Sequence, residues 1–148
     1  MTQTHSVLVA RGPGNAVAAA RLGLTVLDAG DFVVVPLDMA RSLANARTLG
    51  VEHRLLSDMA PDTPVTLRVA AELGLDPVAL IHTDDLDDDN APWATVYHGL
   101  ERTLPVSAGR ASVNAALERV GVRPDGGWDA FDTIGLARLL RPALPMAV

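Results

Sequence analysis

The sequence predicts a single α/β domain with a mixed or mainly parallel sheet flanked by four to five short helices. Two observations lead to this prediction. Short apolar runs alternate along the chain with segments of helical periodicity. Four of those segments end alike, with a glycine between two apolar residues, which is a common stop signal for a helix. The length of 148 residues favours one domain over 1–148, with 142–148 as a flexible tail.

The first third of the chain begins with an apolar strand and a short helix. Asn15 is a good N-cap and Gly23 a good stop, which places the helix at 16–22. Two further apolar runs are separated by the tight turn at 29–31, and they predict a hairpin. The strands expected in this part are 6–10, 24–28 and 32–35, with an exposed strand at 51–56.

Two longer helices precede the central apolar run at 78–81. Asp38 caps the first, at 39–49, and Gly50 ends it. Thr63 and Pro64 combine a capping hydroxyl with proline at the first helical position, so a helix begins there and ends at Gly74. The elements expected after the central run are a strand at 93–97, a helix at 113–120 capped by Ser112, and a last helix from Asp132 or Thr133 to Leu140.

An acidic block directly follows the central run. Five aspartates occupy six positions, where a buried strand would end and where α/β sheets place their ligands. We expect the block to contact a protein partner, for example a basic one, together with two tryptophans of the C-terminal half. The residues of this predicted partner surface are Asp84, Asp85, Asp87, Asp88, Asp89, Trp93 and Trp128.

The alternative for the block is a metal site. Asp84 and Asp85 at a strand end would hold Mg²⁺ or another divalent cation, and His82 would point to the same face of the strand as Asp84. An EF-hand is excluded, because positions six and twelve of such a loop, counted from Asp85, hold Asn90 and Val96. Without the metal alternative, the sequence predicts no cofactor.

Three further patterns point to chemistry less strongly. The turn at Arg11–Asn15 lies between a strand and a helix and resembles part of a phosphate-binding loop, although it lacks the full glycine pattern. His98 and Glu101 could act as an acid–base pair. The segment from Arg68 to Leu75 resembles the start of a helix-turn-helix, in which Pro77–Leu86 would be the recognition helix.

Composition excludes several classes of protein. The net charge of −6 opposes contact with a phosphate backbone, so we expect no nucleic acid as a partner. The chain has no cysteine, no signal peptide and no apolar stretch long enough for a membrane span, and we expect a cytoplasmic protein. The bias toward Ala, Val, Leu, Arg and Gly is typical of high-GC bacteria, and the small-residue core leaves room for a homodimer.

The serines lack the Gly-x-Ser-x-Gly elbow of a hydrolase, and no complete catalytic constellation is visible. The sequence therefore favours a non-enzymatic binding protein, for example an immunity-type inhibitor. The competing hypothesis is a metal-dependent enzyme that acts on a phosphorylated or small polar substrate through Asp84 and Asp85, with His82 or His98 as acid or base.

Overall fold

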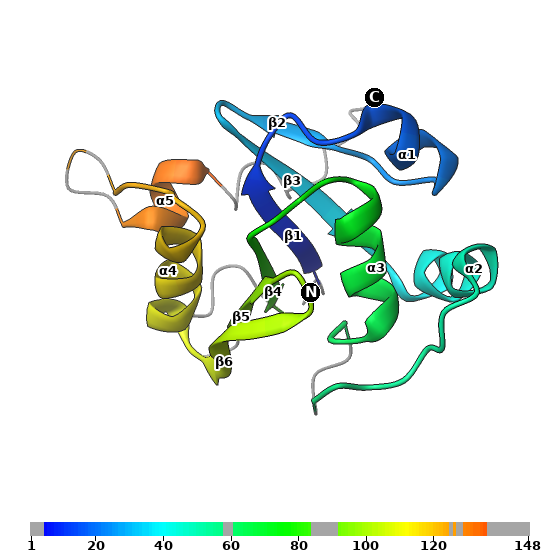
Figure 1. Cartoon of the computed structure of the whole chain (residues 1–148). Helices are drawn as coiled ribbons and strands as arrows, with labels where there is room; N and C mark the ends of the chain where they lie inside the picture. Colours follow the sequence, from blue (N-terminus) through cyan, green and yellow to red (C-terminus); the bar gives the residue numbers. More distant parts are fainter. Residues whose placement is uncertain (1–4, 58–60, 84–91, 125, 127–128, 136–148) are drawn as a thin grey trace, which may run out of the picture.

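The computed structural model describes residues 5–57, 61–83, 92–124, 126 and 129–135. These residues form one α/β domain around a six-stranded sheet in which every neighbouring pair is antiparallel. The spatial order of the strands is β2-β3-β1-β4-β5-β6 (Figure 1). The strands are β1 (His5–Arg11), β2 (Leu27–Ala29), β3 (Phe32–Leu37), β4 (Val78–Thr83), β5 (Trp93–His98) and β6 (Glu101–Ala108).

Helices cover both faces of the sheet. One face packs against α1 (Ala16–Arg21) and α3 (Pro64–Glu72), with α2 (Met39–Leu49) beside α3. The other packs against α4 (Arg110–Arg119) and α5 (Ala130–Ile134), which lie together on the opposite side of the strands in Figure 1. In the described part of the chain no helix is long and apolar enough to cross a bilayer.

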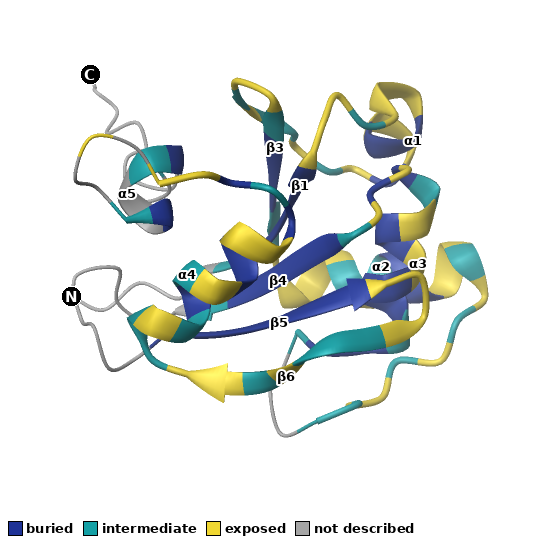
Figure 2. Cartoon of the chain, turned by 60° about the vertical axis from the view of Figure 1, so that its left-hand side comes forward, coloured by how far each residue is buried: buried dark blue, intermediate teal, exposed yellow. Residues whose placement is uncertain are grey.

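The alternation of side chains along each central strand fills both cores. In β1, Leu8 and Ala10 belong to the core under α1 and α3, whereas Val7 and Val9 belong to the core under α4. β3, β4 and β5 alternate in the same way, so most residues in the middle of the four central strands are apolar and buried (Figure 2). This double coverage explains the continuous apolar runs, and the expectation of buried strands at these runs is confirmed.

The predicted mixed or mainly parallel sheet is wrong, because the sheet is wholly antiparallel. The segment with α2 and α3 does connect two strands that point the same way, β3 and β4. β1 lies between these two strands and pairs antiparallel with each of them. A continuous apolar run reports burial on both faces and not strand direction, so the pattern was compatible with either arrangement.

Three local predictions are also corrected. The strand predicted at 51–56 is absent, and 101–108 form the edge strand β6, which the sequence did not indicate. The polar residues and Pro105 hid this strand, yet an edge position tolerates both. The recognition helix of the helix-turn-helix hypothesis does not exist, since Val78–Thr83 is the central strand β4.

The four glycine stops are confirmed. Gly23, Gly50, Gly74 and Gly121 all have positive φ. After each glycine, the next backbone N–H donates to a carbonyl five residues earlier, as Val51 does to Ala46 at 2.9 Å, which is the hydrogen bond of a Schellman stop. The start of α2 and the segment before α3 lie at one end of β1 and β4, where they border a cavity.

Candidate functional site

A half-buried cavity of about 270 Å³ lies at the end of the sheet where β1 begins and β4 ends. It is on the face covered by α2 and α3. Most of its wall is apolar, and a small set of polar side chains reaches it from four segments of the chain. The polar lining residues other than Asp38 are Ser6, Ser42, His53, Thr63 and His82.

One wall of the cavity is a row of side chains across three strands. Ser6 of β1 lies opposite His82 of β4, and His82 lies opposite Trp93 of β5. The Ser6 Oγ is 2.6 Å from His82 Nδ1, and the His82 ring packs against the Trp93 indole with 5.5 Å between ring centroids. Strand register therefore holds the imidazole between a hydroxyl and an aromatic ring.

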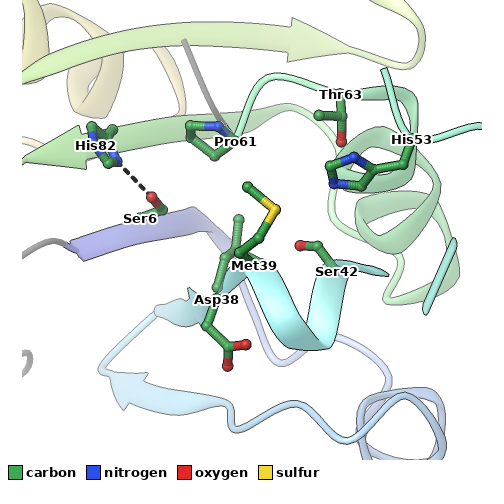
Figure 3. Close-up of a pocket in the computed structure, with 9 residues that line it drawn as sticks. Ser6, Asp38, Met39, Ser42, His53, Pro61, Thr63 and His82 are labelled. Atoms are coloured by element: carbon green, nitrogen blue, oxygen red, sulfur yellow. Dashed lines mark hydrogen bonds between the residues drawn. The ribbon is translucent and has the colours of Figure 1, made fainter. Parts of the chain in front are cut away.

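The opposite wall comes from α2 and from the segment that leads into α3. Figure 3 shows Met39 between the Ser6–His82 pair and the group formed by Ser42, His53 and Thr63. Met39 is half exposed, and its flexible thioether can adapt to the shape of a bound molecule. The cavity thus has two imidazoles and three hydroxyls around an apolar space.

The helix starts that border the cavity are satisfied by their own caps. Asp38 Oδ1 accepts from Arg41 N at 2.7 Å, and its carboxylate points away from Met39 and Ser42 in Figure 3. Thr63 Oγ1 accepts from Thr66 N at 3.2 Å. None of the described lining residues is an arginine, so the site presents no guanidinium to an anionic group.

The contact between Ser6 and His82 permits proton transfer between them, because an imidazole nitrogen within hydrogen-bond reach can take a proton from a serine hydroxyl. Ser6, however, lies within a strand and not on the sharp turn that exposes the nucleophile of a hydrolase. The geometry therefore favours binding over nucleophilic catalysis.

A second polar cluster lies on the same face of the sheet. It forms where the segment before α3 meets β5 and β6. Asp62 is fully buried and accepts two hydrogen bonds, from the Tyr97 hydroxyl at 2.6 Å and from Arg102 Nη2 at 2.8 Å. Arg102 also donates to Thr95 Oγ1 at 2.9 Å and lies over the Tyr97 ring. We call these four residues, Asp62, Thr95, Tyr97 and Arg102, the Asp62 network.

Burial raises the pKa of Tyr97 far above its ordinary value, and the hydrogen bond to the Asp62 carboxylate raises it further. We expect the native protein to show no tyrosinate absorbance at pH values where free tyrosine has ionised, above about 10. The chain has one tyrosine, so an alkaline absorbance titration reports on Tyr97 alone.

The raised pKa also sets a direction for stability. Below about pH 10 the hydroxyl is protonated in both the folded and the unfolded chain, and its contribution to stability is complete. Above that pH the unfolded chain ionises first, so stability falls as pH rises. A matched titration in urea should return the ordinary tyrosine pKa, and an ordinary pKa in the native protein would contradict the buried network.

The predicted partner and metal residues are mostly outside the described part of the chain. The residues outside it are Asp84, Asp85, Asp87, Asp88, Asp89 and Trp128. Trp93 is a core residue and is 4% exposed, so it packs against His82 and does not offer a surface anchor. Among the described residues, no three His, Asp or Glu side chains are grouped closely enough to hold a metal ion. The partner surface and the metal site remain predictions.

His98 lies at the tip of the β5–β6 hairpin, beside Glu101 in the strand register. Its Nδ1 is 3.0 Å from Asp76 Oδ1, and both side chains are substantially exposed. Asp76 Oδ1 also accepts from Gly99 N at 2.9 Å. The contacts of His98 therefore support a role in fastening the hairpin to the segment before β4, and the acid–base pair remains a prediction.

The turn after β1 does not offer a backbone cradle for phosphate. Gly12 N donates to Asp31 O at 2.9 Å and Asn15 N donates to Leu73 O at 2.9 Å, while Pro13 has no N–H. The Asn15 side chain accepts from Ala18 N, as its prediction as an N-cap requires. Two of the amides on which the phosphate-loop hypothesis depended are thus already used.

The residues that form the cavity were largely missed by sequence reasoning. His82 was a candidate ligand, but Ser6 was considered only as a nucleophile, and Thr63 only as a helix cap. His53 falls within the exposed strand predicted at 51–56, and the sequence predicts no role for it in a site. Their spacing carries no signal, because the strands and helices that bring them together are far apart in sequence.

Comparison with protein-family models, with curated proteins and with solved structures gives no match for this chain. We therefore base the function on the geometry of the described residues. The class that the fold and the cavity define is an antiparallel α/β sandwich with a cavity at one end of its sheet.

Proposed function

We propose that the protein binds a small neutral organic molecule in the cavity beside Ser6 and His82. The observation that carries this proposal is the convergence of two imidazoles and three hydroxyls on one mostly apolar cavity of about 270 Å³. Ligand pockets generally combine apolar walls with a few polar groups that orient the ligand. The volume is slightly below the usual range for drug-sized ligands, which favours a compact molecule.

The polar groups indicate the chemistry of the ligand. Ser42, Thr63 and the imidazoles can donate to or accept from an alcohol, amide or ketone. The Asp38 carboxylate caps its own helix and the described lining contains no arginine, so a carboxylate or phosphate group would find no guanidinium to pair with. These features favour a neutral ligand over an anionic one.

Trp93 provides a direct reporter, since it packs against His82. In a Trp128→Phe background Trp93 is the only tryptophan. We expect cyclohexanol or benzamide to change its fluorescence in a saturable way. Filling the cavity by Ser42→Leu should abolish this response. Thr48→Leu is the matched control, because Thr48 lies on the same helix but is exposed and does not line the cavity.

An unchanged response in the Ser42→Leu protein would refute the proposal, as would the absence of saturable binding by either neutral probe. Contact of the acidic block with a basic macromolecule and metal-dependent catalysis through Asp84 and Asp85 stay separate predictions. Charge reversal of Asp87, Asp88 and Asp89 tests the former.

A further inference from the structure

A second cavity, of about 460 Å³, lies at the opposite end of β1 from the Ser6–His82 pocket. It is bordered by the β2–β3 turn, by the segment that follows α4 and by α5. Two arginines, Arg11 and Arg123, line it together with one acidic residue, Asp31. The described lining therefore carries a net positive charge in a protein whose overall charge is −6.

The guanidinium of Arg11 lies against an aromatic ring and donates no hydrogen bond to any other residue that the structure describes. It lies 5.2 Å from the centroid of the Phe32 ring, which also lines the cavity. On its other side is Gly121, where a Cβ would come within 3.1 Å of Arg11 Nε and Nη2. The absence of a side chain at Gly121 thus leaves the space that this guanidinium occupies.

Neither arginine is neutralised by the part of the chain that the structure describes. Arg11 and Arg123 make no ion pair with a described carboxylate, in contrast to Arg21, Arg102 and Arg110. A guanidinium with unused N–H groups is suited to bidentate contact with a carboxylate or a phosphate. Val122 and Ile134 add apolar surface to the same cavity.

We propose that Arg11 and Arg123 form a binding site for a small organic oxyanion, whose phosphate or carboxylate group pairs with the guanidinium groups and whose apolar part contacts the walls. The site replaces the backbone phosphate loop that the turn after β1 suggested. It is separate from the Ser6–His82 pocket, because the two lie at opposite ends of β1 and share none of their described lining residues.

The test is calorimetric titration of the full chain at constant ionic strength with phenyl phosphate, benzoate and inorganic phosphate, and with benzyl alcohol as the neutral probe. We expect saturable binding of phenyl phosphate or benzoate, with inorganic phosphate weaker because it cannot use the apolar walls. The tighter of the two organic anions assigns the head group. Any heat from benzyl alcohol should be unchanged in Arg123→Gln, because a neutral alcohol is expected to bind only in the Ser6–His82 pocket.

Arg11→Gln and Arg123→Gln should each raise the Kd of the organic anion by about tenfold or more, since each removes charge-assisted hydrogen bonds. Asp31→Asn should lower this Kd by about twofold to fivefold, because it removes from the lining a negative charge that repels the anion. Arg119→Gln is the matched control: it is exposed, makes the same change of charge and does not line the cavity.

Arg123 is exposed, so the Arg123→Gln protein should have the unfolding midpoint of wild type. Loss of binding in this variant therefore reports a binding role and not a folding defect. An absence of saturable binding by both organic anions would overturn the proposal. So would equal weakening by Arg119→Gln, which would indicate only general electrostatic attraction. Ser42→Leu should leave benzoate binding unchanged, so the two proposed sites can fail separately.

Discussion

Asp62→Asn should destabilise the protein by about 3 kcal/mol, although it removes a charge and changes almost no volume. Asp62 is fully buried, and its carboxylate accepts from both Tyr97 and Arg102. Removing one member of a buried ion pair typically costs about 3–5 kcal/mol, because the remaining charge is left without compensation. Arg102 is 26% exposed and can regain some water, which places the expected cost at the lower end.

Urea unfolding followed by circular dichroism measures this loss. Asp76→Asn is the matched control: it makes the same chemical change in a pair with His98 whose side chains are 48% and 66% exposed. Exposed pairs contribute less than about 1 kcal/mol, so the control should unfold almost like wild type. Equal losses in the two variants would show that burial of Asp62 is not the source of the effect.

A double-mutant cycle tests whether Asp62 and Arg102 act as a pair. Arg102→Met should cost markedly less in the Asp62→Asn background than in wild type, because the charge that it removes is already uncompensated there. Additive losses would mean that the two residues stabilise the protein independently. The Asp62 network joins the segment before α3 to β5 and β6. The coupling free energy of the cycle is therefore the contribution of this pair to the contact between that segment and the sheet.

Leu80→Ala should cost about 4 kcal/mol. Leu80 has no exposed surface and lies in the middle of β4, opposite Leu8 of β1 and Thr95 of β5. Leu→Ala changes in protein cores cost about 2–5 kcal/mol, with the larger values where the surroundings cannot collapse into the cavity. β4 is hydrogen-bonded on both edges and covered on both faces, which favours a value in the upper half of this range.

The matched control is Leu100→Ala, the same substitution at a residue that is 84% exposed at the β5–β6 turn. It should change the free energy of unfolding by no more than about 0.5 kcal/mol. Urea unfolding of both variants, with the slope of the transition compared to wild type, gives the two values. A loss below about 1 kcal/mol for Leu80→Ala would contradict the tight packing between β4 and α3.

The fold was predictable where a few neighbouring residues decide the outcome. Thr63 and Pro64 begin α3, Asp38 caps α2 through Arg41 N, and Gly50 ends it with positive φ. The hairpin of β2 and β3 also follows from its turn residues. Ser112 shows where even local rules were insufficient: it is predicted to cap the helix, but α4 begins three residues earlier, at Arg110 after Gly109.

The site could be predicted from the sequence less well than the fold. His82 was identified because it adjoins the acidic block, yet its position in the structure is defined by Ser6 and Trp93, which face it from the neighbouring strands. Asp62 looks like an ordinary loop residue, because nothing adjacent to it in sequence reports that Tyr97 and Arg102 will surround it. The role of a buried polar residue depends on the side chains that contact it in the fold. A single sequence does not show which distant side chains those are.

The sequence by itself determined where the helices stop and which strands are buried, because a cap or a Schellman stop depends on about six consecutive residues and a strand's burial on its own apolar run. Strand direction, the position of β1 between β3 and β4, and both cavities depend on long-range packing. Ser6 and His82 are 76 residues apart and meet through a strand pairing. Such a pairing depends on how the whole apolar surface of the sheet can be buried at once, and no local pattern encodes that choice.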